Sequence, residues 1–264
     1  MGLRRFWRKP APPAPAAGDP LRGLAFDDPG GPIGSYLLEG LAKIEGWGAN
    51  PFTARIFLIL DAAQSAAGVT GHLFELGVHY GRSAILFALM ARAGEHAVFL
   101  DLFDDQDANL DRSGEGNEAV LRANLARWAP GTPVEIVQGN SLETAFENLP
   151  HLGQGTRLAH IDGGHHLEAV QNDLEKTDAV LAEGGIIVMD DFLHSGFPEV
   201  NEACNRYLAA TDRLVPIALG RNKLVLCRPS HAEGYHAHLA GHLTGRLGKR
   251  VRFHGAEALC LDIH

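Results

Sequence analysis

Two short acidic sequences are the part of this chain best suited to chemistry. The first is Ile-Asp-Gly-Gly-His-His at 161–166, and the second is Ile-Val-Met-Asp-Asp-Phe at 187–192. Each follows an apolar run typical of a buried parallel strand, and ligands of open α/β sheets bind outside the carboxyl ends of such strands. If the two strands are neighbours, about 4.8 Å apart, Asp162, Asp190 and Asp191 converge. Because three close carboxylates repel one another, the sequence predicts a hard divalent cation among them.

A glycine-containing turn connects an earlier strand to a helix over residues 74–83. Gly77 can adopt the positive φ of a sharp turn, and Gly81 allows close approach where free helix N–H groups favour an anionic group. A dinucleotide fingerprint would place further glycines where His79 and Arg82 stand. The loop therefore favours a smaller nucleoside-type ligand over NAD, although a tight turn that binds nothing would also use two glycines.

Further polar residues follow the second and third predicted strands. Asp101 is the first choice and Asp104 the second for a carboxylate that accepts both hydroxyls of a ribose. The alternative is a cap or a solvated acidic loop. Asn140 and Ser141 are placed to contact an adenine edge, but they are also ordinary turn residues. The spacing alone does not separate these alternatives.

The elements that must position these residues alternate between strand and helix. The strands are expected at 72–76, 97–103, 134–138, 156–161 and 185–189, with helices at 81–93, 118–128, 168–182 and 199–209. A terminal hairpin is expected over 214–218 and 223–227. This alternation predicts an α/β fold with a doubly wound, mostly parallel, Rossmann-like sheet.

The chain divides into four predicted segments. Residues 1–32 form a flexible N-terminal tail, 33–70 hold N-terminal helices, 71–229 form the α/β domain, and 230–264 form a His-rich extension. The helices expected at 34–45 and 52–67 could cover the cofactor site or form a contact between copies of the chain. In the extension, His238 and His242 would share a helix face and could bind zinc. Without an obvious third ligand, a solvated helix or tail is favoured.

Composition limits the classes of partner and compartment. The chain has 264 residues, a formal net charge of −9 and 45% hydrophobic residues, so nucleic acid and anionic membranes are disfavoured as partners. No apolar run approaches the roughly 20 residues of a bilayer span. The three scattered cysteines lack metal-site spacing, which fits free thiols in the reducing cytoplasm.

With these elements in order, residues 71–228 resemble class I S-adenosylmethionine-dependent methyltransferases. The motifs that carry the resemblance are Glu75-Leu76-Gly77 with Gly81 and Ser83, His160 to His165 with Glu168 and Asp173, Glu183 to Ile187, and Asp190-Asp191. The chain is similar to the methyltransferase family 24 branch, typified by metal-dependent sugar O-methyltransferases, and more distantly to the catechol type. The resemblance implies a seven-stranded sheet whose last strand is antiparallel.

The resemblance also implies a role for each matching residue. Glu75, Gly77, Gly81 and Ser83 would hold the methionine part of S-adenosylmethionine, and Asp101 would hold the ribose. Asn140 or Ser141 would face the adenine, although the family more often has Asp at the position of Asn140. Asp162, Asp190 and Asp191 would bind Mg²⁺ or another hard divalent cation, and His165 would be the catalytic base.

The leading hypothesis is thus a metal-assisted O-methyltransferase acting on a hydroxyl of a small molecule or sugar. The cation would lower the pKa of the hydroxyl, and His165 would take its proton. In the alternative readings His165 only packs or bonds locally, and Asp190-Asp191 caps a turn. Two other functions remain open: a metal-independent N-methyltransferase whose acidic cluster binds an amine, and a non-catalytic cofactor-binding scaffold or partner subunit.

Overall fold

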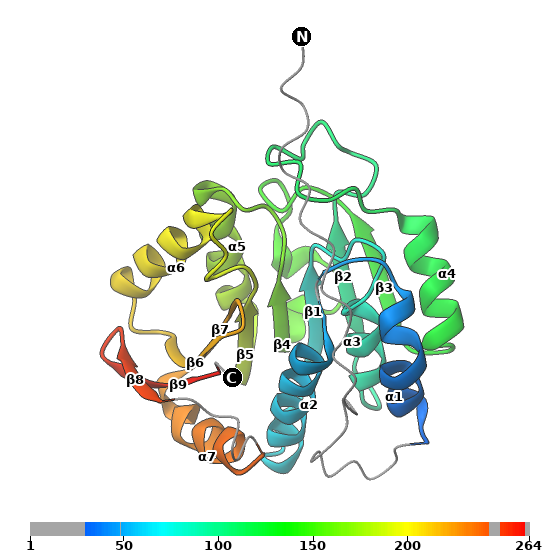
Figure 1. Ribbon diagram of the computed structural model, residues 1–264. Coiled ribbons are helices and arrows are strands. Elements are labelled where there is room, and N and C mark those ends of the chain that lie inside the picture. Colours follow the sequence, from blue (N-terminus) through cyan, green and yellow to red (C-terminus); the bar gives the residue numbers. More distant parts are fainter. Residues whose placement is uncertain (1–29, 48, 243–248, 262–264) are drawn as a thin grey trace.

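The structure, a computed structural model, describes residues 30–47, 49–242 and 249–261. The tail predicted over 1–32 lies almost entirely outside the described residues. The described chain forms one mixed nine-stranded sheet, with the order β3-β2-β1-β4-β5-β7-β6-β9-β8 (Figure 1). Among the described residues, no helix is long and apolar enough to cross a membrane.

Five parallel strands form the centre of the sheet. They are β1 (His72–Leu76), β2 (Ala97–Asp101), β3 (Val134–Gln138), β4 (Thr156–Ile161) and β5 (Leu181–Met189). The chain moves outward from β1 through β2 to β3 and then returns to β4 on the other side of β1. This reversal places a topological switch point between β1 and β4, where ligands of doubly wound sheets bind.

The prediction of a seven-stranded sheet was wrong in the number of strands. The seven strands through β6 (Val215–Gly220) and β7 (Lys223–Cys227) are present, and β7 lies antiparallel to β5. The extension adds α7 (Ala232–His242) and a hairpin of β8 (Arg250–Phe253) and β9 (Ala256–Cys260). Strand β9 pairs with β6 and so covers an edge that would otherwise expose unpaired backbone groups.

Helices cover both faces of the sheet (Figure 1). One face packs against α1 (Pro32–Ser35), α2 (Pro51–Ala66), α3 (Ala84–Met90), α4 (Glu118–Trp128) and α7. The other packs against α5 (Leu167–Ala179), α6 (Pro198–Ala210) and the short turn η3 (Phe146–Asn148). The short turns η1 (Tyr36–Gly40), η2 (Leu41–Lys43), η4 (Leu152–Gln154) and η5 (Pro229–His231) complete the elements. Both apolar faces of the sheet are therefore buried, as a parallel sheet requires.

Local sequence explains where the first long helix begins. The side chain of Asn50 accepts hydrogen bonds from the backbone N–H groups of Phe52 and Thr53, at 2.9 and 3.0 Å. Pro51 occupies the first helical turn, where its missing N–H costs no hydrogen bond. The helix α2 is thus capped at its N-terminus, and its buried face is fixed against the sheet.

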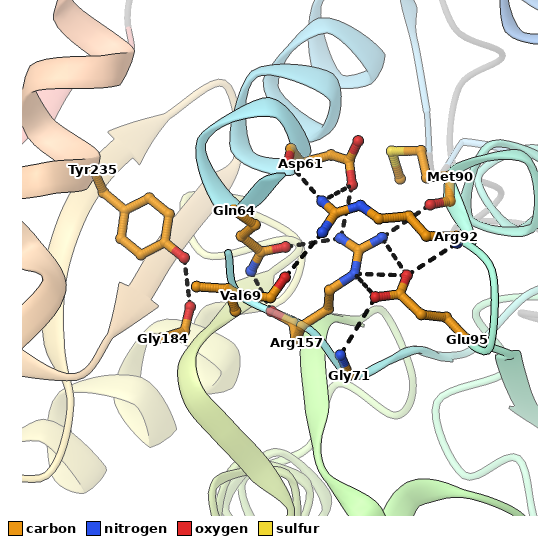
Figure 2. A network of polar contacts seen from close by, with 10 residues as sticks. All are labelled: Asp61, Gln64, Val69, Gly71, Met90, Arg92, Glu95, Arg157, Gly184 and Tyr235. Carbon is orange, nitrogen blue, oxygen red and sulfur yellow. Dashed lines mark hydrogen bonds and ion pairs between the residues drawn. The ribbon is translucent and has the colours of Figure 1, made fainter. Parts of the chain in front are cut away.

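A buried arginine connects α2 to the beginnings of the central strands. Arg157 of β4 is fully buried, and its Nε lies 3.0 and 2.9 Å from the two carboxylate oxygens of Glu95. Its Nη1 also donates to Asp61 at 2.7 Å and to Gln64 at 2.9 Å, both from α2. Figure 2 shows these groups converging on the guanidinium. Such a pair withstands burial because its hydrogen bonds replace those to water.

Candidate functional site

A pocket lies outside the carboxyl ends of the central strands, at the switch point. Leu76 and Ile161 are paired in register, and so are Ile161 and Met189, so the loops that follow β1, β4 and β5 begin level with one another. The pocket is lined by residues within the segments 45–47, 76–83, 101–116, 139–142 and 162–169. The fold therefore brings most of the sequence-predicted site residues to one place.

The glycines of the first loop are required by close packing. Gly77 has φ +80°, and a Cβ on it would lie 2.0 Å from the carbonyl oxygen of Asp162. Gly81 has φ +91°, and its Cβ would lie 2.4 Å from Leu121. Gly77 lines the pocket, whereas Gly81 does not and instead lets the loop pack on α4. Any side chain at Gly77 would push apart the loops after β1 and β4.

Asp101, predicted to bind a ribose, lines the pocket and organises the glycine loop. One carboxylate oxygen accepts the backbone N–H groups of Val78 and His79 at 2.7 and 2.9 Å. The other accepts the N–H of Phe103 at 2.7 Å. The carboxylate is thus held in place at the end of β2, next to the space that a nucleoside would enter.

The predicted adenine residues and Ser83 also lie in the pocket wall. Asn140 accepts the N–H of Leu142 with its side chain at 3.0 Å, and the carbonyl of Ser141 accepts from Lys176 at 2.6 Å. Ser83 is buried at the beginning of α3 and borders the same space. All three residues therefore lie at the carboxyl ends of the central strands, beside the pocket.

The loop before α2 closes another side of the pocket. Arg82 donates to the carbonyl of Gly46 at 2.6 Å, and the ring of Trp47 lies 5.5 Å from that of His79. His79 is itself stacked on Tyr80 at 3.9 Å between ring centroids. The N-terminal segment thus forms an aromatic and polar wall of the pocket.

Asp162, His165 and Asp191 form an acidic cluster at the other end of the pocket. One potential ligand atom from each lies within 4.8 Å of the others. His165 Nε2 is 2.9 Å from Asp191 and 3.9 Å from Asp162. Asp162 and His165 border the pocket, while Asp191 is buried beside them. Two of the three predicted carboxylates therefore meet as expected.

Asp111 joins this cluster and was not predicted as a site residue. Its carboxylate accepts the backbone N–H of His165 at 2.7 Å and lies 2.9 Å from Nδ1 of the same ring. It comes from the loop between β2 and α4, whose many Asp residues indicate only a solvated acidic loop. No periodicity distinguishes Asp111 from Asp104, Asp105 or Asp107, so only the folded loop reveals its partner.

The ionisation of His165 follows from its neighbours. Burial acts to lower its pKa, but hydrogen bonds to Asp111 and Asp191, with the charge of Asp162, outweigh burial and raise the pKa to about 9. For Asp111, burial acts to raise the pKa, and the bonds to His165 outweigh it, so the pKa lies well below the usual range. Three carboxylates thus surround one imidazolium, which leaves a negative balance suited to a cation.

The structure does not bring Asp190 to this cluster, contrary to the prediction. Its carboxylate forms an ion pair with Lys223 and lies 3.7 Å from His160 Nε2. Both aspartates lie just after β5, and Asp191 has a positive φ of 55°, so the backbone turns between them and the two side chains separate. Burial acts to raise the pKa of Asp190, but Lys223 and His160 outweigh it and hold the pKa below its usual range.

Glu75, predicted to hold the methionine part of the cofactor, also turns away from the pocket wall. It is fully buried, and its carboxylate lies 2.7 Å from His160 Nδ1. Glu75, His160, Asp190 and Lys223 form a buried row of charged and polar groups across β1, β4, β5 and β7. In this geometry Glu75 orients His160 beneath the loops that follow β1 and β4, and it does not line the pocket.

The donor set of the acidic cluster fits a divalent cation. Two carboxylates and an imidazole surround a common point, and Asn222 donates to the second carboxylate oxygen of Asp191. Carboxylate oxygens suit Mg²⁺ and Mn²⁺, and an imidazole is accepted by Mn²⁺ and later transition metals. With Asp190 paired to Lys223, Asp162 and Asp191 are the carboxylates that could hold the cation, and His165 lies beside them.

Comparison with known proteins identifies the fold. The sequence model of a methyltransferase domain matches residues 74–192. The O-methyltransferase NovP is similar at 20% identity and a TM-score of 0.56, covering 67% of this chain and 80% of its own. A search of curated sequences finds no match.

Two further solved structures share more of the chain. A putative O-methyltransferase from Klebsiella pneumoniae has 18% identity and a TM-score of 0.57, covering 79% of this chain and 93% of its own. An O-methyltransferase from Bacillus cereus in complex with SAH has 17% identity and a TM-score of 0.53, covering 78% and 93%. At these identities the structures establish the fold alone. The chain therefore has the fold of solved O-methyltransferases, and its residues 74–192 match the sequence model of a methyltransferase domain.

Proposed function

We propose that this chain is an O-methyltransferase that transfers the methyl group of S-adenosylmethionine to a hydroxyl of a small molecule or sugar, assisted by a divalent cation such as Mg²⁺. The observation that carries the proposal is the cluster of Asp162, His165 and Asp191 at one end of the cofactor-sized pocket. A cation there would lower the pKa of a hydroxyl bound to it and orient that oxygen. The O-methyltransferases similar in fold support the same chemistry.

In this proposal the cofactor occupies the end of the pocket formed by the glycine loop. The fixed carboxylate of Asp101 would accept the ribose hydroxyls, and Ser83 would contact the methionine part. Asn140 and Ser141 would border the adenine. The acidic cluster would then hold the acceptor hydroxyl, and transfer would require its oxygen to lie in line with the methyl group.

His165 is the residue we assign to accept the proton of the hydroxyl, at Nε2. Its Nδ1 faces Asp111 at 2.9 Å, which holds the proton on Nδ1 and leaves Nε2 for proton transfer. In the structure Nε2 is bonded to Asp191, and the raised pKa keeps the ring protonated. His165 can therefore act as a base only after Asp191 turns to another partner and the pKa falls toward working pH.

The metal requirement separates this proposal from its nearest rival. We expect EDTA treatment followed by gel filtration to abolish methyl transfer to hydroxyl acceptors, and Mg²⁺ or Mn²⁺ to restore it. Full activity in the metal-free protein, or turnover confined to amine acceptors, would instead support a metal-independent N-methyltransferase.

Site variants test the residue roles and the possibility of a non-catalytic scaffold. We expect Asp162→Ala to lose turnover and metal binding while calorimetry shows that S-adenosylhomocysteine still binds. Asp101→Ala should weaken cofactor binding instead, and His165→Ala should cut turnover by about 10²- to 10⁴-fold, the usual contribution of a general base. Tight cofactor binding by the wild type without turnover on any acceptor would favour a scaffold.

A further inference from the structure

Three histidines meet at the edge of the sheet opposite the pocket. His72 begins β1, His96 directly precedes β2, and His151 directly precedes η4. One ring nitrogen from each lies within 4.8 Å of the others. These residues are far apart in the sequence, and nothing in the methyl-transfer proposal uses them.

The hydrogen bonds of the three rings indicate which nitrogen of each could bind a metal ion. The backbone N–H of His96 donates to Nδ1 of His72 at 3.1 Å, and Gln154 hydrogen-bonds the same ring, so the His72 proton sits on Nε2. Nε2 of His151 lies 3.5 Å from the Glu135 carboxylate, which favours a proton on that nitrogen. Nδ1 of His96 is buried and has no hydrogen-bond partner among the described residues. Nδ1 is therefore uncommitted on His96 and His151, whereas on His72 it accepts the backbone N–H of His96, so His72 would bind an ion through Nε2 in exchange for its hydrogen bond to Gln154.

The three rings pack closely against one another. The rings of His96 and His151 are stacked at 3.7 Å between centroids and 11° between planes, and the ring of His72 lies 5.1 Å from that of His151. Burial lowers the pKa of His72, and the nearby His151 and His96 lower it further. Neutral imidazole is the form that binds a metal ion.

The backbone that carries two of these histidines is held by the Arg157 network. Gly71 precedes His72, and Glu95 precedes His96. The Glu95 carboxylate, paired with Arg157, also accepts the backbone N–H of Gly71 at 3.4 Å (Figure 2). The network therefore fixes the starts of β1 and β2 relative to each other.

We propose that His72, His96 and His151 bind a transition-metal dication, with Zn²⁺ the best match, at a structural site independent of methyl transfer. Three imidazoles suit Zn²⁺, Cu²⁺ or Ni²⁺, whereas Mg²⁺ and Ca²⁺ require oxygen ligands. At a Zn–N distance of about 2.0–2.1 Å the nitrogens would draw closer together, and the partly exposed rings of His96 and His151 can make that movement. Glu135 would orient His151 as an outer carboxylate, and water would complete the coordination.

Equilibrium dialysis of the untagged full-length chain measures how much Zn²⁺ it binds. An Asp162→Asn/Asp191→Asn background removes the acidic cluster as a competing site. We expect this double variant to bind one Zn²⁺ per chain. It should lose the ion when His96→Gln or His151→Gln is added. Added Glu135→Gln should weaken binding by roughly 10- to 100-fold, the usual effect of losing an outer partner. The matched control is His254→Gln, an exposed histidine outside the cluster, which should retain the ion.

Thermal unfolding supplies a second readout. Zn²⁺ should raise the melting temperature of the background protein and of the His254→Gln control, but not that of folded His96→Gln. Circular dichroism checks that each variant is folded. The proposal is overturned if the background protein binds no Zn²⁺, or if folded His96→Gln and His151→Gln bind it as tightly as the background does.

Discussion

Replacing Arg157 by Met should destabilise the protein far more than any surface charge change. Arg157 has no exposed side-chain surface, and Met keeps most of its aliphatic volume while removing the guanidinium. Glu95, whose side chain is 6% exposed, would then retain only the backbone N–H groups of Arg92 and Gly71. Breaking one side of a buried ion pair typically costs about 3–5 kcal/mol.

The matched control is Arg92→Met, because Arg92 also pairs with Asp61 at 2.8 Å. Its side chain is 27% exposed, and Asp61 would keep its bond to Arg157, so we expect a loss of only about 1 kcal/mol. The double variant Arg157→Met/Glu95→Gln should lose less than the sum of its two single variants, since the buried carboxylate is neutralised.

Urea unfolding followed by circular dichroism measures each free energy of unfolding. At about 2–4 °C per kcal/mol for a chain of this size, Arg157→Met should lower the melting temperature by roughly 6–20 °C. If Arg157→Met were within about 1 kcal/mol of the wild type, or no more damaging than Arg92→Met, the buried network would not have the energetic role assigned to it.

Three further predictions concern the surroundings of the pocket. Burial raises the pKa of Asp173 to about 6, against hydrogen bonds from Ser141 and Asn172 that act to lower it. The folded protein thus binds this proton more tightly than the unfolded chain does, and the ionised carboxylate destabilises the fold as the pH rises through 6. The free energy of unfolding of Asp173→Asn should therefore exceed that of the wild type by up to roughly 3 kcal/mol above pH 7 and by almost nothing below pH 4. Urea unfolding across that pH range measures the difference. Gly77→Ala should weaken S-adenosylhomocysteine binding by at least about tenfold in calorimetry, because its Cβ would meet the Asp162 carbonyl and its positive φ costs about 1–2 kcal/mol; unchanged affinity would contradict the close packing of the two loops. Asp111→Asn should lower kcat by roughly 10- to 100-fold with little change in cofactor affinity, because His165 loses the carboxylate that fixes its ring; a wild-type kcat would remove Asp111 from the site.

The alternation of strands and helices allowed most of the fold to be predicted. The strand expected over residues 72–76 is β1, and the one expected over 134–138 is β3, because short β-rich segments bounded by turn residues have few alternatives. The helix expected over 81–93 is shorter, at Ala84–Met90, since Gly81 adopts a positive φ and the turn continues to Ser83. Local sequence therefore determined the order of elements better than their ends.

The last two strands had a signal that the His-rich composition obscured. Residues 250–253 read Arg-Val-Arg-Phe, with alternating polar and apolar side chains, and His254-Gly255 follow with positive φ at both positions. Two successive positive φ values are typical of a hairpin turn whose twist matches the strands. What the sequence could not indicate is that this hairpin pairs with β6, because that contact depends on which sheet edge is open.

The candidate site was predicted in part, for a similar reason. Asp162 follows β4, and strand order alone places it at the pocket. Local sequence did not separate Asp190 from Asp191, because the lysine that pairs with Asp190 comes from β7, far along the chain. Asp111 lies in an irregular loop, and its contact with His165 depends on tertiary structure alone.

The most direct test of the proposed site is a crystal of the protein grown with S-adenosylhomocysteine and Mn²⁺. Anomalous scattering locates the manganese without reference to the rest of the density. We predict one manganese bound by Asp162 and Asp191, beside His165 and next to the sulfur of the cofactor, with Asp190 still paired to Lys223. A manganese held by Asp190 instead, or a cofactor-bound crystal with no manganese near Asp162, would contradict the account.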